Sequence, residues 1–155
     1  MSTIRILGIG SPSGGDQAGW LTVDALRATG VGDIDEVFID KLDRPGANLI
    51  SLLEHASRVI LIDAMQSNGP IGRIQRFDQM DWPDYRQGLS SHGFGVLDAL
   101  SLARELGSLP ARLDLYGIEI DSASPGEQAG GEIQAAARQL ARRIAADLAA
   151  TIRQA

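Results

Sequence analysis

The sequence predicts an α/β fold, with helices on both faces of a mostly parallel sheet. Three observations lead to this prediction. Strand-like apolar runs alternate along the chain with helix-like patterns. The segment at 58–64 contains the apolar run Val59-Ile60-Leu61-Ile62, as in a strand buried on both faces. The run at 4–9 leads into a glycine-rich turn and then an amphipathic segment. We therefore expect a three-layer sandwich of the phosphorylase/hydrolase-like kind, formed by a single domain over residues 1–155.

The first half of the chain is expected to alternate strands with helices. A strand at 4–9 precedes a helix at 17–29, whose buried face is predicted from Leu21, Ala25 and Ala28 and which Gly30 is placed to end. Further strands are expected at 34–40, 58–64 and 71–77, with a polar loop at 41–46 and a short helix at 47–55. The alternation of apolar and polar residues at 71–77 favours an edge strand.

The second half begins with an irregular segment at 78–91, and long loops in compact domains are often functional. Gly93 and Gly95 lead into a helix that is expected to end near Leu106. A strand follows at 112–119, then a loop at 121–131 and a final helix at about 132–152. The apolar stripe of that helix consists of Ile133, Leu140, Ile144 and Leu148.

Composition narrows the function classes. The 155 residues include no cysteine, which excludes a disulfide framework, a cysteine nucleophile and a cysteine metal site. The net charge of −6 argues against nucleic acid and anionic membranes as partners. The sequence shows no apolar stretch long enough to cross a bilayer and no signal-type N-terminus, so we expect a cytoplasmic protein.

Three polar residues are placed where parallel strands end. Asp16 follows the first strand, Asp63 ends the buried strand at 58–64, and His92 lies in the loop before a helix. Because the carboxyl ends of parallel strands share one edge of a sheet, these side chains can converge there. Two carboxylates and an imidazole form an open three-ligand site for a divalent transition metal, which can polarise a carbonyl or activate water.

Each of these residues also has a structural interpretation. Asp16 can simply cap the helix that follows it. A carboxylate in an apolar strand is costly to bury without a partner, so Asp63 can instead serve a structural hydrogen bond. His92 can be an ordinary loop histidine. Spacing alone does not decide between these interpretations and the metal site.

The ordered set of motifs resembles the nickel-dependent endopeptidases that mature the large subunit of [NiFe] hydrogenases. Their opening Gly-x-Gly-Asn motif and the later acid-x-x-Gly motif correspond to residues 8–11 and 16–19, and their strand-end acid corresponds to Asp63. Their Ser-x-His-x-x-Gly motif corresponds, with the final glycine displaced, to Ser90, His92 and Gly95. The segments 96–100 and 115–119 are also similar, so the resemblance covers nearly the whole chain.

The resemblance implies an enzyme of aspartic or metal-dependent type, with Asp16, Asp63 and His92 as catalytic and metal-binding residues. It implies that the protein removes a C-terminal extension from a [NiFe] hydrogenase large-subunit precursor, its protein partner, after nickel insertion. The nickel would be contributed by the substrate, and the protease would act as a monomer. The sequence departs from the family pattern at Ser11, which replaces an Asn, at Gly15, which replaces the first acid, and in the loop at 40–46.

Two other functions are compatible with parts of the sequence. Gly8, Gly10 and Gly14 come close to a dinucleotide-binding fingerprint, and Asp40 ends the second strand, which is the pattern of an oxidoreductase. The third glycine is one residue late, and Asp16 and Asp63 would repel a pyrophosphate. The altered loop at 41–46 favours instead a non-catalytic, partner-binding protein of the same fold.

Overall fold

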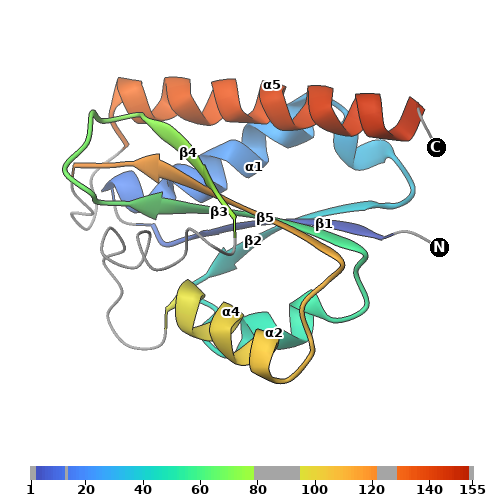
Figure 1. Ribbon diagram of the computed structural model, residues 1–155. Helices are drawn as coiled ribbons and strands as arrows, with labels where there is room; N and C mark the ends of the chain where they lie inside the picture. Colours follow the sequence, from blue (N-terminus) through green and yellow to red (C-terminus); the bar gives the residue numbers. More distant parts are fainter. Residues whose placement is uncertain (1–2, 13, 79–94, 122–128, 154–155) are drawn as a thin grey trace.

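The computed structural model describes residues 3–12, 14–78, 95–121 and 129–153. Its five strands form one sheet in the order β2-β1-β3-β5-β4. The strands are β1 (Ile4–Gly10), β2 (Val37–Asp43), β3 (Arg58–Met65), β4 (Ile74–Phe77) and β5 (Arg112–Glu119). The helices are α1 (Ala18–Ala28), α2 (Asn48–Leu53), α4 (Val96–Glu105) and α5 (Gly131–Arg153), with 3-10 turns at Gly14–Gln17 and Val31–Asp33 (Figure 1).

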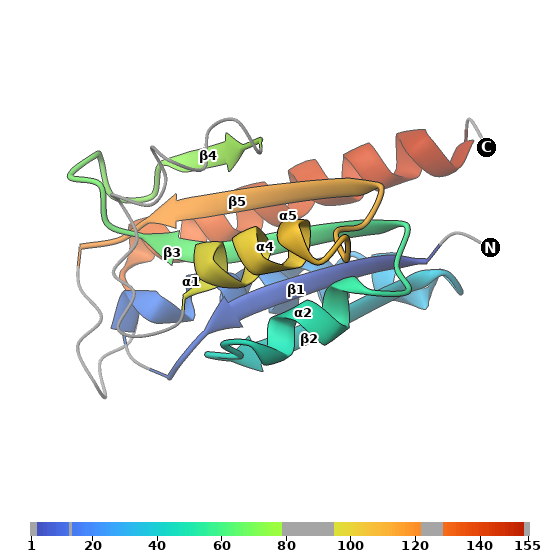
Figure 2. The same cartoon turned by 60° about the horizontal axis from the view of Figure 1, so that its bottom comes forward.

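The sheet lies between two helical layers. Helices α1 and α5 cover one face, and α2 and α4 cover the other (Figures 1 and 2). A hydrophobic core lies on each face of the sheet. In the first core, Ile6, Ile60 and Ile62 of the sheet pack against α1 and α5. In the second core, Leu7, Leu61 and Leu115 pack against α2 and α4. The predicted three-layer α/β architecture is therefore confirmed.

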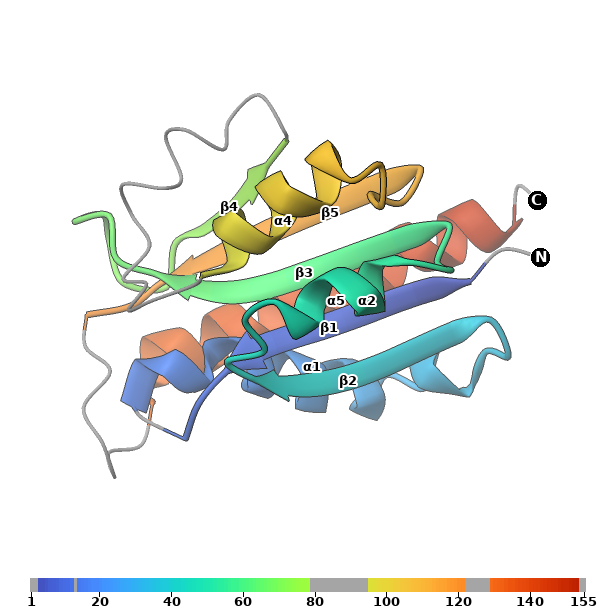
Figure 3. The ribbon, with the colours of Figure 1, turned by 90° about the horizontal axis from the view of Figure 1, so that it is seen from below.

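Four of the strands are parallel. Strand β1 pairs with β2 and β3, and β3 pairs with β5, all in parallel register. Strand β4 is antiparallel to β5 and lies at the edge of the sheet, as the alternation at 71–77 predicted. The carboxyl ends of β1, β2, β3 and β5 consequently lie at one edge of the sheet, which we call the carboxyl edge (Figure 3). The opposite side of the sheet, where these four strands begin, is called the amino edge.

Strand β2 is displaced from its predicted range of 34–40. Residues 34–36 form a turn closed by Val37 N–H, which donates to Ile34 O at 3.0 Å. The strand then runs to Asp43, because the glycine-rich end of β1 offers parallel partners as far as Gly10. The predicted loop at 41–46 is therefore wrong for its first three residues.

Helix α1 buries a different face from the one predicted. Its buried residues are Ala18, Gly19, Thr22, Val23 and Leu26, whereas Ala28 is exposed and Leu21 and Ala25 are only partly buried. The physical reason is close backbone contact at Gly19, described below. Gly30 ends this helix as predicted, with a φ of 83° that a side chain would disfavour.

The other predicted elements agree more closely. Strand β5 has the predicted bounds, and β3 extends one residue beyond them. All four residues of the stripe predicted for α5 are buried. Within the part of the chain that the structure describes, no helix is long and apolar enough to cross a membrane.

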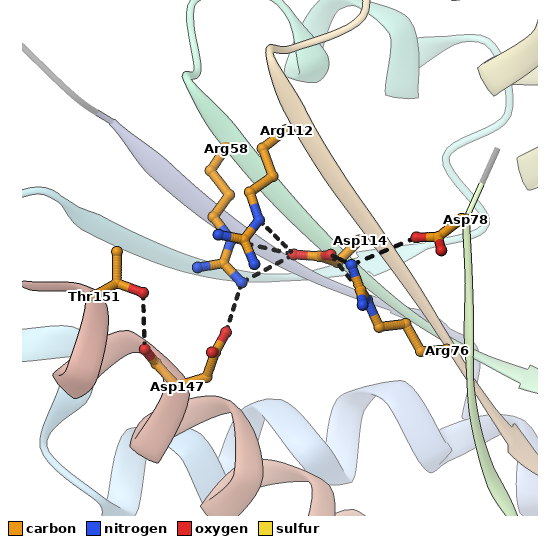
Figure 4. Close-up of polar contacts among 7 residues, drawn as sticks. All are labelled: Arg58, Arg76, Asp78, Arg112, Asp114, Asp147 and Thr151. Carbon is orange, nitrogen blue, oxygen red and sulfur yellow. Dashed lines mark hydrogen bonds and ion pairs between the residues drawn. The ribbon is translucent and has the colours of Figure 1, made fainter.

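An ion cluster joins strands and helix α5 toward the amino edge (Figure 4). Asp114 of β5 is 1% exposed and accepts hydrogen bonds from Arg58 of β3 and Arg76 of β4, at 2.9 and 2.7 Å. Arg58 Nη2 also donates to Asp147 of α5 at 2.8 Å, and this bond lowers the pKa of Asp147. The cluster thus fixes three neighbouring strands and one helix relative to one another.

Candidate functional site

Asp16 lies beyond the end of β1, in the 3-10 turn that precedes α1. Its side chain is half-buried, and its Oδ2 accepts a hydrogen bond from the hydroxyl of Ser11. The N-cap position of α1 is Gln17, and no side chain among the described residues caps the helix. The helix-cap interpretation of Asp16 is therefore wrong, and the carboxylate is left at the carboxyl edge.

Two glycines bring the start of α1 against the sheet. A Cβ atom on Gly19 would lie 2.4 Å from Ile9 O of β1 and 2.6 Å from Ile62 O of β3. A Cβ atom on Gly8 would lie 2.4 Å from Gly19 O. Only glycine permits backbones to approach so closely. The first turn of α1 therefore contacts β3 at the residue before Asp63.

Asp63 lies near the end of β3, in parallel register with Gly117 of β5. The residues on either side of it are buried, whereas Asp63 itself is half-buried. Its Oδ1 accepts a hydrogen bond from Ala64 N–H at 2.8 Å. This carboxylate interrupts the apolar residues 59–65 of the strand, so its burial opposes ionisation.

The charge state of Asp63 reflects this environment. Burial raises the pKa of Asp63 to about 7, while the hydrogen bond from Ala64 N–H acts in the opposite direction. The negative charge of Asp16 raises the pKa further, so the two carboxylates lie close enough to repel each other. The predicted meeting of Asp16 and Asp63 at the carboxyl edge is consistent with this repulsion.

His92 and the segment around it lie outside the described residues, so the structure does not test the third member of the predicted site. The described chain resumes at Gly95, whose N–H donates to Asp98 Oδ2 at 2.9 Å where α4 begins. Helix α4 starts near the carboxyl end of β3 (Figures 2 and 3). Within the described ranges, no three His, Asp or Glu side chains gather as metal ligands.

Two polar residues at the carboxyl edge, Ser11 and Glu119, make contacts that the sequence analysis did not predict. Ser11 is 4% exposed and donates a hydrogen bond to the carboxylate of Asp16. In the sequence, the spacing of five residues between the two is the only signal for that contact. Glu119 ends its strand after the run 115–118, as Asp63 follows the run 59–62, and that similarity could have identified it.

Glu119 is 1% exposed and fixes the loop that follows β3. Its carboxylate accepts hydrogen bonds from Ser67 N–H at 2.6 Å, from Gly69 N–H at 3.3 Å and from the Ser67 hydroxyl, and it pairs with Arg73 at 3.4 Å. Burial raises its pKa, but these donors outweigh burial and keep the pKa below the ordinary value. Glu119 is therefore an ionised anchor, in contrast to Asp63.

Comparison with protein families gives a match over more than half of the chain. The family model for hydrogenase maturation protease matches residues 44–147. The matched part contains Asp63 and His92, whereas the opening turn with Asp16 precedes it. No curated protein matches the chain.

Solved structures of maturation proteases share the fold. The hydrogenase maturating endopeptidase HybD from E. coli is 24% identical, with a TM-score of 0.80 over 96% of this chain and 93% of that one. The [NiFe] hydrogenase maturation protease HycI from Thermococcus kodakarensis KOD1 is 23% identical, with a TM-score of 0.71 over 93% and 90%. The hydrogenase 2 maturation peptidase from a Thaumarchaeota archaeon is 24% identical, with a TM-score of 0.70 over 96% and 99%. Neither the oxidoreductase nor the non-catalytic alternative finds support among these matches.

Proposed function

Because the chain belongs to the hydrogenase maturation protease family, we propose that it cuts a C-terminal extension from a [NiFe] hydrogenase large-subunit precursor once nickel has been inserted. The proposal extends the family assignment to a substrate, a metal and three residues of this chain. The observation that carries it is the pair of carboxylates, Asp16 and Asp63, at the carboxyl edge.

We place His92 with these carboxylates as the third member of the site. The covalent chain keeps its Cα within about 11 Å of the Cα of Gly95, three residues later. Gly95 immediately precedes α4, on the face of the sheet where the second core lies. Residues two apart in a strand point to the same face of the sheet. Leu61 and Met65 belong to that core, so the side chain of Asp63 between them is on the same face. This shared face of the sheet supports the proposal that His92 joins Asp63 in the site.

The chemistry of this ligand set explains why the metal would come from the substrate. Two carboxylates and one imidazole without a thiolate form an incomplete coordination set for nickel. The site should hold free nickel weakly and bind it well only when the precursor supplies further ligands. Recognition of the metal would then report that insertion is complete, and the same ligands would place a water molecule for attack on the peptide bond.

The location and assembly of the protein are also part of the proposal. A net charge of −6 disfavours nucleic acid and anionic membranes as partners, and the chain contains no cysteine to serve as nucleophile. We accordingly propose a cytoplasmic, monomeric endopeptidase whose partner is the precursor.

Asp16→Asn tests the assignment of the site. We expect processing of a nickel-loaded precursor to be abolished, with unfolding free energy changed by less than about 1 kcal/mol, because Asp16 is not the helix cap. Processing is followed by the mass of the precursor, and stability by urea unfolding. The control is Asp24→Asn, which changes an exposed acid of α1 that pairs with Lys41 and should leave processing intact. An active Asp16→Asn variant, or one that unfolds, would refute the assignment.

A further inference from the structure

Ser11 is a buried residue at the start of the turn that joins β1 to α1 and contains Asp16. It follows the last residue of β1 and is 4% exposed. Its Oγ donates a hydrogen bond to Asp16 Oδ2, and its backbone N–H donates to Asp16 O at 3.4 Å. One residue thus holds both the side chain and the backbone of Asp16.

The turn is built so that these two contacts can form. A Cβ atom on Gly10 would lie 2.5 Å from Asp16 O, so only glycine allows the backbone at Asp16 to close onto the end of β1. Gly14, with a φ of 49°, and Gly15 are buried in the same turn. The backbone at Gly10 and the backbone at Asp16 therefore lie close together, and the Ser11 hydroxyl is a side-chain donor to the acid.

We propose that Ser11 is the positioning residue for Asp16, which its hydroxyl orients for contact with the nickel of the precursor. The inference rests on the proposed function, because it assigns Asp16 a role toward that metal. Ser11 itself touches neither metal nor peptide in this account. Among the described residues its bond is made to Oδ2, and we assign Oδ1 of the carboxylate to the ligand.

The direction of the hydrogen bond matters for this role. A hydroxyl that donates to a carboxylate stabilises its ionised form, which is the form that binds a metal. Partners that orient metal-binding side chains typically contribute 10- to 100-fold to metal affinity or activity.

The test compares binding of nickel-loaded and nickel-free precursor to Ser11→Ala. The measured quantity is the ratio of the two dissociation constants, since a general loss of structure would weaken both. We expect the ratio to fall by about 10-fold or more in Ser11→Ala, while affinity for the nickel-free precursor stays the same. Ser11→Thr keeps the hydroxyl, and Ser11→Asn supplies an amide donor. At least one of them should restore the ratio.

The matched control is Ser57→Ala, which removes a hydroxyl that donates to Thr3 O at 3.0 Å, just before β1 and β3 begin. It should leave the ratio unchanged. An unchanged ratio in Ser11→Ala, failure of both donor variants to restore it, or unfolding of Ser11→Ala while Ser57→Ala stays folded would each overturn the inference. If the parent protein does not distinguish the two precursors, the proposed function itself fails, so the two failures can be told apart.

Discussion

At the scale of single residues, the most telling difference lies between two acids, the half-buried Asp63 and the buried Glu119. Both side chains lie near the ends of neighbouring parallel strands. Glu119 receives several donors and has a lowered pKa, whereas Asp63 receives one backbone donor and has a raised pKa. The number of donors thus separates an acid that fixes a loop from one that is free to bind a ligand.

The raised pKa of Asp63 makes stability depend on pH. The native state holds this proton up to a pKa of about 7, against an ordinary value of 3.8, so it binds more protons than the unfolded chain between these values. The contribution of Asp63 to stability is therefore fully present below pH 3.8 and is lost as the pH rises through 7. Asp63→Asn carries no charge and should not suffer this loss.

We expect Asp63→Asn to gain stability relative to the parent protein between pH 5 and pH 8. The gain should be on the order of 1 kcal/mol, after allowance for solvent screening at a half-buried site. Urea unfolding at the two pH values measures it. A stability difference independent of pH would contradict the assigned environment of Asp63.

At the scale of elements, α1 packs on the ends of β1 and β3, and this brings the turn that holds Asp16 against the strand that holds Asp63. Gly19→Ala should destabilise the protein by about 2 kcal/mol, because the added methyl would collide with Ile9 O and Ile62 O. Gly130→Ala is the control, since a Cβ atom there meets none of the described atoms within 4 Å. Thermal unfolding of both variants checks this prediction. Equal stability of Gly19→Ala and the parent protein would show that the contact is not required.

The elements also show how far the sequence predicts the fold. Buried strands such as β3 and a long amphipathic helix such as α5 have strong local patterns, and both were predicted. The start of β2 and the buried face of α1 were not, because parallel pairing with β1 and the backbone contact at Gly19 decide them. Asp16 and Asp63 were identified from their positions after apolar strands. Ser11, the hydrogen-bond partner of Asp16, was not, because a side-chain contact in a turn has no periodicity.

At the scale of the whole molecule, the ion cluster and the candidate site lie toward opposite edges of the sheet. Arg58 and Asp147, which are 89 residues apart, meet in that cluster, so no local pattern could predict the pair. Asp114→Asn would leave the buried charge of Arg58 without its partner in β5, and we expect a loss of about 3 kcal/mol in unfolding free energy.

This loss should leave the function of the folded molecules intact. The variant should still distinguish nickel-loaded from nickel-free precursor at a temperature where it is folded, because Asp114 is far along β5 from the carboxyl edge. Arg44→Ala, which breaks an exposed ion pair with Asp43, should cost less than about 0.5 kcal/mol. Loss of nickel discrimination in folded Asp114→Asn would show that the two edges are coupled.

The measurement that tests the central claim most directly is cleavage of the precursor with and without its nickel. The same precursor is prepared in both forms, incubated with the protease and followed by mass. The account predicts cleavage of the nickel-loaded form and little cleavage of the nickel-free form, even with the protease in excess. Efficient cleavage of the nickel-free precursor in the presence of a strong chelator would contradict recognition of a substrate-held metal by Asp16, Asp63 and His92.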